Sequence, residues 1–371
     1  MKVAIIHDWL TGMRGGERCL EVLCEIFPGA DLFTLLHIPG SVSPMIEKRL
    51  IRTSFIQHLP FSKWRYRTYL PLFPMAIERF SLKGYDLILS CSHCVAKGVI
   101  PCPEALHISY LLTPMRYAWD MYEEYFGESQ NKIIPIFMHY LRLWDVTSSQ
   151  RVDHFLCISK HVANRVEKFY RRKGEVIHPP VDTKRFGLRN QKEDFFLIVS
   201  SLTRYKRIDL AIEAFNRLRY PLKIIGSGPE EKRLRSVARS NVEFLGWQSD
   251  RVVSESYSAC RALIFPGEED FGIVPLEAMA SGRPVIAYGK GGALETVIPY
   301  DQPDQPGDGV PTGLFFHEPN VDSVIGAVER FHKIEREFDP AAIRNHTLQW
   351  DRERFKEKME KYIFDKMGSR C

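Results

Sequence analysis

The chain has 371 residues, of which 44% are hydrophobic and 26% are charged, and its formal net charge at pH 7 is +5. This length predicts two domains of ordinary size, and the composition excludes a disordered or fibrous protein. The mild positive charge suits an anionic small ligand or contact with anionic lipid. It falls short of the concentrated basic face that a nucleic-acid-binding protein needs, so no nucleic acid is expected as a partner.

The N-terminal segment MKVAIIHDWL holds an apolar run that ends at His7 and Asp8, and this run is too short for the core of a signal peptide. The most apolar candidate span, IIPIFMHYLRLW from Ile133, is interrupted by proline, histidine and arginine and is shorter than a bilayer requires. The sequence therefore predicts a cytoplasmic protein.

Residues 55–80 interleave basic and aromatic side chains, namely Lys63, Arg65 and Arg67 with Trp64, Tyr66 and Tyr69. This mixture predicts peripheral contact with an anionic membrane, on the inner face of the plasma membrane. A solvated helix that packs its aromatic residues inward is the alternative interpretation.

Eight cysteines follow no disulfide spacing, so buried thiols in a reducing compartment are expected. The motif CSHC, from Cys91 to Cys94, with Cys102 and His107 nearby, admits a second interpretation as a zinc site. One C-x-x-C motif without a second close pair is a weak zinc signal, so the expectation is no metal site.

Short apolar runs that end in small or polar residues alternate with helix-like stretches: KVAIIH, DLILS, HISYLL, HFLCIS, FFLIVSS, LKIIGSG, ALIFPG and PVIAYG. Such strands, apolar on both faces, predict parallel sheets of the doubly wound α/β kind. The pattern restarts once, after a proline-containing segment without a clear period. We therefore predict an N-terminal domain over 1–178, a linker over 179–194 and a Rossmann-like domain over 195–345.

The last segment, 346–371, predicts a charged amphipathic helix that packs back on the N-terminal domain. Its apolar residues lie on or near one stripe: Trp350, Phe355, Met359, Tyr362 and Ile363.

Residues 261–297 read as a strand, the loop GEEDFGIV, the helix PLEAMAS and a further strand. Glu269 then lies in the loop and Glu277 in the first helical turn, at the carboxyl end of the sheet, where doubly wound folds bind ligands. A carboxylate in the first turn also complements the helix dipole, so Glu277 alone fits a structural role equally well. The backbone N–H groups beside Gly272 favour phosphate or sugar oxygens, and the whole segment indicates a donor pocket.

Residues 195–300 resemble the nucleotide domain of retaining family-four glycosyltransferases of the GT-B type, in which two Rossmann-like domains face each other across a cleft. The matching segments are YKRIDLAIEAFNRL, LKIIGSGPE, NVEFLGW, FPGEEDFGIVPLEAMASGRPVIAY and GGALETV. Three N-terminal segments resemble the mannosyltransferase branch that builds bacterial surface polysaccharides: IIHDWLTGMRGGERCLEVL, SCSHCVAKGVI and TPMRYAWD. The resemblance covers nearly the whole chain and implies an acceptor-binding N-terminal domain.

The spacing of Glu269 and Glu277 matches the E-x7-E motif of that family. By resemblance, Glu269 contacts hydroxyls of the donor sugar and Glu277 holds the ribose hydroxyls, with the backbone of Phe271, Gly272 and Ile273 between them. Carboxylates suit this role because they accept charge-assisted hydrogen bonds from vicinal hydroxyls.

Lys206, in RYKRID, matches the phosphate-binding lysine of the family. Many members carry an arginine where this chain has Ser201, and Arg204 is expected to substitute for it. Gly15 and Gly16, in MRGGE, are expected in a loop after the first strand that lets backbone N–H groups approach the diphosphate, although a turn alone also explains two glycines.

Family members often have a histidine before TPMRY, where this chain has Leu112. His93 is therefore expected to line the site, and a buried, hydrogen-bonded histidine is the alternative. Arg116 and Tyr117 are expected on the acceptor side.

Together, the resemblance implies transfer of a hexose, namely mannose from GDP-mannose, to a saccharide or a lipid-diphosphate-linked acceptor. Retention through front-face attack and no metal cofactor are expected. Two alternatives stay open on the same scaffold, a catalytically weak nucleotide-binding protein and a nucleotide-sugar epimerase. A glycoside hydrolase is disfavoured by Lys206 and LKIIGSGPE, which indicate a nucleotide.

Overall fold

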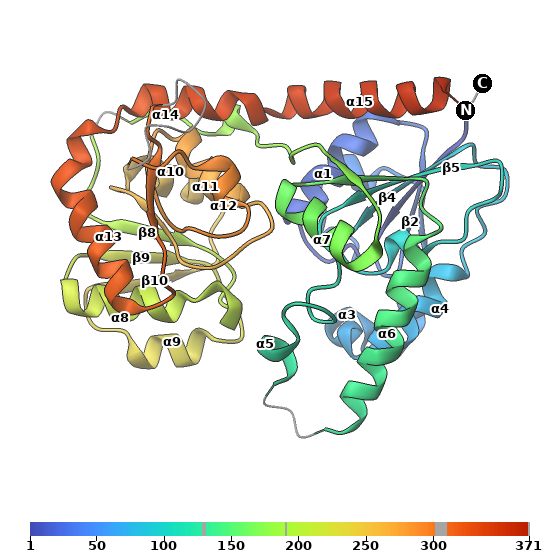
Figure 1. Ribbon diagram of the computed structural model, residues 1–371, viewed down its shortest axis with the longest axis horizontal. Coiled ribbons are helices and arrows are strands. Elements are labelled where there is room, and N and C mark those ends of the chain that lie inside the picture. Colours follow the sequence, from blue (N-terminus) through green and yellow to red (C-terminus); the bar gives the residue numbers. More distant parts are fainter. Residues whose placement is uncertain (128–130, 190, 301–309, 370–371) are drawn as a thin grey trace. The chain divides into compact units, whose positions relative to one another are not determined.

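The computed structural model describes residues 1–127, 131–189, 191–300 and 310–369, which form two compact units (Figure 1). Unit 1 comprises Met1–Pro180 and Glu353–Cys371, and unit 2 comprises Val181–Arg352. The predicted linker, 179–194, is therefore not a separate segment, because unit 2 begins at Val181.

In the described part of unit 1, seven parallel strands pair in the order β3-β2-β1-β4-β5-β6-β7. Their bounds are β1 Val3–His7, β2 Asp31–Thr34, β3 Ile51–Thr53, β4 Leu87–Ser92, β5 Leu106–Leu111, β6 His154–Cys157 and β7 Gly174–Val176. The central strands β1, β4 and β5 are buried along their whole length, which explains why their sequences are nearly continuous apolar runs.

The helices of unit 1 connect these strands: α1 Gly15–Ile26, α2 Pro44–Glu47, α3 Ser62–Arg65, α4 Phe73–Glu78, α5 Tyr122–Phe126, α6 Ile133–Ser149 and α7 Lys160–Tyr170. Short 3-10 helices are η1 Phe55–His58, η2 Tyr66–Leu72 and η3 Ala96–Gly98. The start of α7 follows from its cap, since the Ser159 hydroxyl accepts a hydrogen bond from the backbone of Val162 at 3.0 Å.

In the described part of unit 2, six parallel strands pair in the order β10-β9-β8-β11-β12-β13. Their bounds are β8 Phe196–Val199, β9 Leu222–Ile225, β10 Val242–Gly246, β11 Leu263–Phe265, β12 Val285–Tyr288 and β13 Gly313–Phe316. The helices are α8 Ile208–Leu218, α9 Glu231–Val237, α10 Asp250–Ala259, α11 Ile273–Ala280, α12 Ala293–Thr296, α13 Val321–Ile334 and α14 Pro340–Thr347. The 3-10 helices are η4 Thr183–Arg185, η5 Arg204–Lys206, η6 Glu335–Glu337 and η7 Leu348–Trp350.

Both sheets are doubly wound, so the predicted fold class of two Rossmann-like domains is confirmed. In each sheet the strand order reverses at the first strand, between β1 and β4 in unit 1 and between β8 and β11 in unit 2. Ligands of such sheets bind at the carboxyl ends of the strands on either side of this switch point. A ligand site is therefore expected at the loops that follow these four strands.

The final helix α15, Arg352–Gly368, belongs from Glu353 onward to unit 1. Phe355, Met359 and Ile363 are buried, and the ring of Phe355 lies 5.6 Å from that of Tyr110 in β5. Trp350 is not part of this helix as predicted, because it ends the preceding 3-10 helix in unit 2. Among the described residues, no helix is both long enough and apolar enough to pass through a bilayer.

Candidate functional site

The loops after β8 and β11 bring two predicted site residues of unit 2 into contact. Lys206 ends η5, and its ammonium group forms an ion pair with the Glu269 carboxylate, which lies 63 residues further along the chain. The side chains are 14% and 22% exposed, so both groups remain open to a ligand from solvent. The structure thus places a paired cation and anion at the switch point of the unit 2 sheet.

The close approach of two loops holds this pair together. Gly267 begins the loop after β11, and a Cβ atom there would lie 2.9 Å from the Cα atom of Lys206, so a larger residue would push the loops apart. On the other side, the N–H of Gly292 donates to the carbonyl of Glu269 at 2.8 Å. The loop that carries Glu269 is therefore fixed on both sides.

The helix α11 begins two residues earlier than the sequence predicts, at Ile273 instead of Pro275. Gly272 precedes it with φ +90°, a backbone conformation that other residues rarely adopt. The first N–H groups of a helix have no acceptor within it and can bind an anion. Phe271, which precedes Gly272, is buried. Glu277 consequently lies in the second turn of α11, and the predicted first-turn position is wrong.

The Glu277 carboxylate is oriented by a tyrosine from α10. The hydroxyl of Tyr257 donates to Oε2 of Glu277 at 3.0 Å. Burial, together with the charge of Glu277, raises the pKa of the Tyr257 hydroxyl well above its ordinary value, so that the hydroxyl keeps its proton and stays a donor. This tyrosine was not predicted as a site residue, since nothing in the local sequence links it to Glu277.

Ser201 and Arg204 follow β8 on the exposed side of the same loop. Arg204 begins the 3-10 helix that Lys206 ends, so the two cations lie within one short turn. Their predicted roles toward a phosphate stay predictions.

In unit 1, Asp8 organises the corresponding switch point. It follows β1, is fully buried, and accepts backbone hydrogen bonds of 2.6 to 2.9 Å from four consecutive residues after β4, His93, Cys94, Val95 and Ala96. The imidazole Nδ1 of His93 also lies 3.0 Å from Oδ2 of Asp8. Burial would raise the pKa of the Asp8 carboxyl, but the attraction and hydrogen bonds of His93 outweigh it and hold this pKa well below its usual range.

The predicted site residue His93 is neither fully buried nor free. Its side chain is 28% exposed, Nδ1 faces Asp8, and the ring packs edge-on against Trp9 with centroids 4.5 Å apart. Asp8 and Trp9 thus fix the orientation of the ring. Asp8 was not among the predicted site residues, although an aspartate at the end of a buried strand beside a switch point was the available signal.

Gly15 and Gly16 are the first two residues of α1 and not part of a loop, which corrects the prediction. Their N–H groups belong to the free donors of a helix N-terminus, as the predicted contact with a diphosphate requires. Glu17 caps this helix start, because its carboxylate accepts a hydrogen bond from the backbone N–H of Arg14 at 3.0 Å. The same carboxylate lies 3.5 Å from Nε2 of His7. Burial lowers the pKa of His7, but the hydrogen bond and charge of Glu17 outweigh it and raise the pKa above its ordinary value.

Leu112 occupies the place beside this helix start. Its Cδ1 atom lies 2.7 Å from where a Cβ atom on Gly16 would be, so the leucine packs against the predicted diphosphate-binding turn. Tyr117, predicted on the acceptor side, has its hydroxyl 2.8 Å from the Cys94 thiol. Arg116 lies in the same segment and is partly buried.

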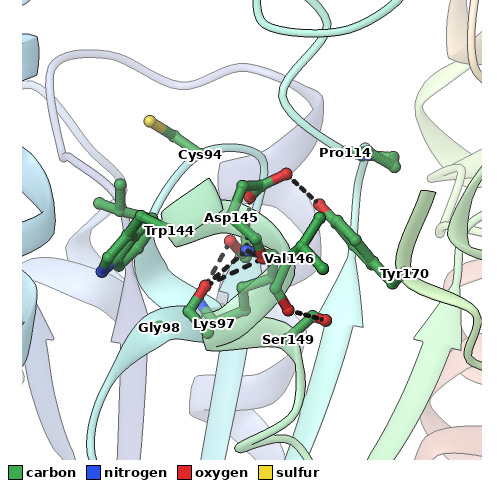
Figure 2. A network of polar contacts seen from close by, with 12 residues as sticks. Cys94, Lys97, Gly98, Pro114, Trp144, Asp145, Val146, Ser149 and Tyr170 are labelled. Carbon is green, nitrogen blue, oxygen red and sulfur yellow. Dashed lines mark hydrogen bonds and ion pairs between the residues drawn. The ribbon is translucent and has the colours of Figure 1, made fainter. Parts of the chain in front are cut away.

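A buried ion pair joins η3, which follows His93 in the chain, to α6 (Figure 2). Lys97, in η3, is 1% exposed and its Nζ lies 2.6 Å from Oδ1 of Asp145 in α6. The Tyr170 hydroxyl and the Trp119 indole each donate to Oδ2 of Asp145 at 2.8 Å. Because Trp119 belongs to TPMRYAWD, this network joins the His93 loop to the segment that holds Arg116.

The alternative interpretation of CSHC as a zinc site finds no support in the described residues, where no group of His, Cys, Asp or Glu is placed to hold a metal ion. Cys91 and Cys94 are buried, and burial raises the pKa of both thiols well above the ordinary value.

We expect Asp8→Asn to lower the free energy of unfolding at pH 7 by about 3 kcal/mol, because one amide oxygen cannot satisfy four backbone donors and an imidazole. The pKa of Asp8 lies below its unfolded value of about 3.9, so its contribution is present above pH of about 4 and is lost as the pH falls. Urea unfolding from pH 7 to 3 should therefore show the difference between wild type and variant shrinking with acid. The exposed Asp86→Asn serves as the control, and a difference that is independent of pH would contradict the prediction.

The fold is shared with known proteins. The chain resembles the solved structure of HepE from Anabaena in complex with UDP-glucose, with a TM-score of 0.71 and 15% sequence identity over 98% of this chain and 100% of that one. At this identity the likeness establishes the fold, which is the GT-B fold of two Rossmann-like domains.

Unit 2 carries the family match. Residues 181–347, which make up less than half of the chain, match the family described as glycosyl transferases group 1. An uncharacterised glycosyltransferase of Methanocaldococcus jannaschii is 31% identical over 151 residues, 39% of this chain and 43% of the relative. The O-antigen chain mannosyltransferase C of Escherichia coli is 35% identical over 102 residues, 26% of this chain and 28% of the relative. The match thus spans less than half the length of these curated relatives.

Proposed function

We propose that the protein is a retaining glycosyltransferase that moves a hexose, namely mannose from GDP-mannose, to a saccharide or lipid-linked saccharide acceptor. The ion pair of Lys206 and Glu269 is the single observation that carries this proposal. The pair lies at the switch point of the unit 2 sheet, within the residues that match glycosyl transferases group 1. There the cation can bind a diphosphate and the anion can bind sugar hydroxyls. The mannosyl donor rests on the name of the E. coli relative and on the resemblance of the N-terminal segments.

The chemistry follows from these charges. The bond between the anomeric carbon and the diphosphate oxygen breaks while the acceptor oxygen bonds to the same face of the sugar, and the acceptor proton passes to the departing phosphate. Lys206 stabilises the negative charge that grows on the diphosphate, and the free N–H groups of α11 add to this stabilisation. The proposed reaction uses no metal cofactor, because cationic side chains and helix N–H groups neutralise the leaving group.

In this proposal Glu277 binds the nucleotide, and the hydrogen bond from Tyr257 holds its carboxylate in one orientation. Vicinal ribose hydroxyls donate two hydrogen bonds to one carboxylate, so this residue anchors the nucleoside half of the donor. The acceptor is assigned to unit 1, beside His93 and the Arg116 segment. A lipid-linked acceptor also requires peripheral contact of the protein with an anionic membrane at the cytoplasmic face.

Thermal-shift binding of GDP, UDP, ADP and their sugars to wild type and to Glu277→Ala tests this proposal. We expect GDP and GDP-mannose to raise the melting temperature of the wild type as their concentration rises, by the equivalent of about 2.7 kcal/mol at a hundredfold excess over Kd. Glu277→Ala should lose this shift. The control Glu213→Ala, exposed on α8, should keep it.

The outcomes separate the candidate functions. A shift with UDP alone would reject the guanine donor and keep the transferase. A shift in the wild type without turnover of any nucleotide sugar would favour a catalytically weak binding protein. Absence of a shift with every nucleotide would reject the donor site in unit 2.

A further inference from the structure

One face of α6 is apolar and exposed. Its inward face is buried, with Met138, Leu141 and Trp144 in the core of unit 1. Its outward stripe carries four large apolar or aromatic side chains with exposed fractions of 50% to 72%: Ile133, Ile136, Tyr140 and Leu143. Their spacing of three, four and three residues follows one side of a helix. A water-facing helix surface normally carries polar residues there, so this stripe needs an apolar environment.

A second exposed pair lies at α3. Trp64 is 80% exposed and Phe61 is 68% exposed. Phe61 also has φ 56°, in the left-handed region, which is unfavourable for an aromatic residue. Backbone strain that leaves a phenylalanine ring in solvent indicates a functional role for that ring.

Both elements cover the same core. Tyr66 and Phe73, which follow α3, belong to one hydrophobic cluster with Met138 and Leu141 of α6. The exposed side chains of α3 and α6 are therefore parts of the surface over this cluster. We call this surface the apolar face, defined by Phe61, Trp64, Ile133, Ile136, Tyr140 and Leu143.

The exposed charges beside the two aromatic residues at α3 are positive. Lys63, Arg65 and Arg67 are exposed between and after its two aromatic residues. The acidic residue of 54–80, Glu78, is engaged by the Arg151 guanidinium at 2.6 Å. The acidic residue of α6, Asp145, is buried. Long cationic side chains beside exposed aromatic rings match an anionic lipid headgroup layer over an apolar interior.

We propose that the apolar face inserts into the interface of an anionic lipid bilayer, with α6 lying in the membrane plane and Lys63, Arg65 and Arg67 on the headgroups. Its role for the enzyme rests on the proposed function, since it says where a lipid-linked acceptor is met. The neighbouring helix α5 is excluded from the face because it presents Glu123 and Glu124 to solvent.

Co-sedimentation with vesicles tests the proposal, using equal parts of phosphatidylglycerol and phosphatidylcholine against phosphatidylcholine alone. Wild type should bind the anionic vesicles at low salt and lose affinity as salt rises. Trp64→Glu and Ile136→Glu should each lower the affinity about tenfold or more, since they place a charge in the apolar layer. Replacing Lys63, Arg65 and Arg67 together by glutamine should lower it on the order of a hundredfold, or about fivefold per cation.

The matched control is Leu50→Glu, because Leu50 is 60% exposed in unit 1 outside the apolar face. It should bind vesicles as wild type does. Equal loss in this control, or absence of wild-type binding to anionic vesicles, would overturn the proposal. A wild-type dimer that Ile136→Glu dissociates, without vesicle binding, would instead assign the face to a second copy of the chain and also overturn it.

The nucleotide thermal shift, measured on the same preparations, keeps the two proposals apart. Variants that keep the shift are folded and have an intact donor site, so their loss of vesicle binding belongs to the apolar face. Vesicle binding by a wild type that no nucleotide stabilises would reject the proposed transferase and leave the membrane surface in place.

Discussion

Lys206→Ala is expected to lower kcat of sugar transfer by about a hundred- to a thousandfold, the loss typical of removing one group that stabilises developing charge. Lys206 is paired with Glu269, and in the proposed reaction its ammonium group stabilises the leaving diphosphate. Because this charge grows only as the bond breaks, kcat should fall more than the affinity for GDP. The measurement is steady-state release of GDP from GDP-mannose with a saccharide acceptor, beside direct titration with GDP.

Lys232→Ala is the control for this variant, since Lys232 is exposed on α9. Its rate should equal that of the wild type. Lys206→Arg should keep part of the rate, because it preserves the charge and alters the shape of the group. A Lys206→Ala enzyme with unchanged kcat and a raised KM would show that the lysine only holds the substrate and does not assist departure of the diphosphate.

Asp145→Asn is expected to lower the free energy of unfolding by about 3–5 kcal/mol, because it leaves Lys97 as an uncompensated charge in the core of unit 1 (Figure 2). Lys97→Met should lower the free energy of unfolding by a similar amount, because it leaves Asp145 as an uncompensated buried charge. The double variant should cost less than the sum, since neither charge then remains alone. Urea unfolding followed by tryptophan fluorescence measures this, with Trp119 and Trp144 both in contact with the network.

The comparison variant is Lys366→Met, which removes the ion-pair partner of the exposed Glu175 in the same unit. It should change the free energy of unfolding by less than about 1 kcal/mol. Additive costs in the double variant of Lys97 and Asp145 would mean that the two side chains contribute independently, and not as a pair.

The strands could be predicted because they are buried on both faces, as β1 and β12 are, and a continuous apolar run then suffices. Helix starts were less certain. The first turn of α11 depends on the positive φ of Gly272, and Pro275 was the stronger local signal, so Glu277 was placed one turn too early. Sequence propensity predicts that a helix forms, but the residues at which it begins and ends depend on local backbone geometry.

The sequence predicted single residues of the candidate site but not the contacts between them. Lys206 and Glu269 were each named from motifs, yet their ion pair joins loops that only the sheet order brings together. Asp145 and Lys97 gave no sequence signal, since charged residues are normally exposed and nothing local indicates a buried pair. Long-range pairing of polar groups therefore needs the fold before it can be seen.

The division of the chain has a consequence for its synthesis. Unit 1 includes Glu353–Cys371, so its residues are interrupted by the whole of unit 2. A ribosome finishes unit 2 while unit 1 still lacks the helix α15, whose Phe355, Met359 and Ile363 are buried in the finished fold. Domains fold as units during translation, usually the N-terminal one first. Here the second domain in the sequence is the first that can close its core, and until α15 emerges the nascent first domain exposes the apolar surface that Phe355 covers beside Tyr110.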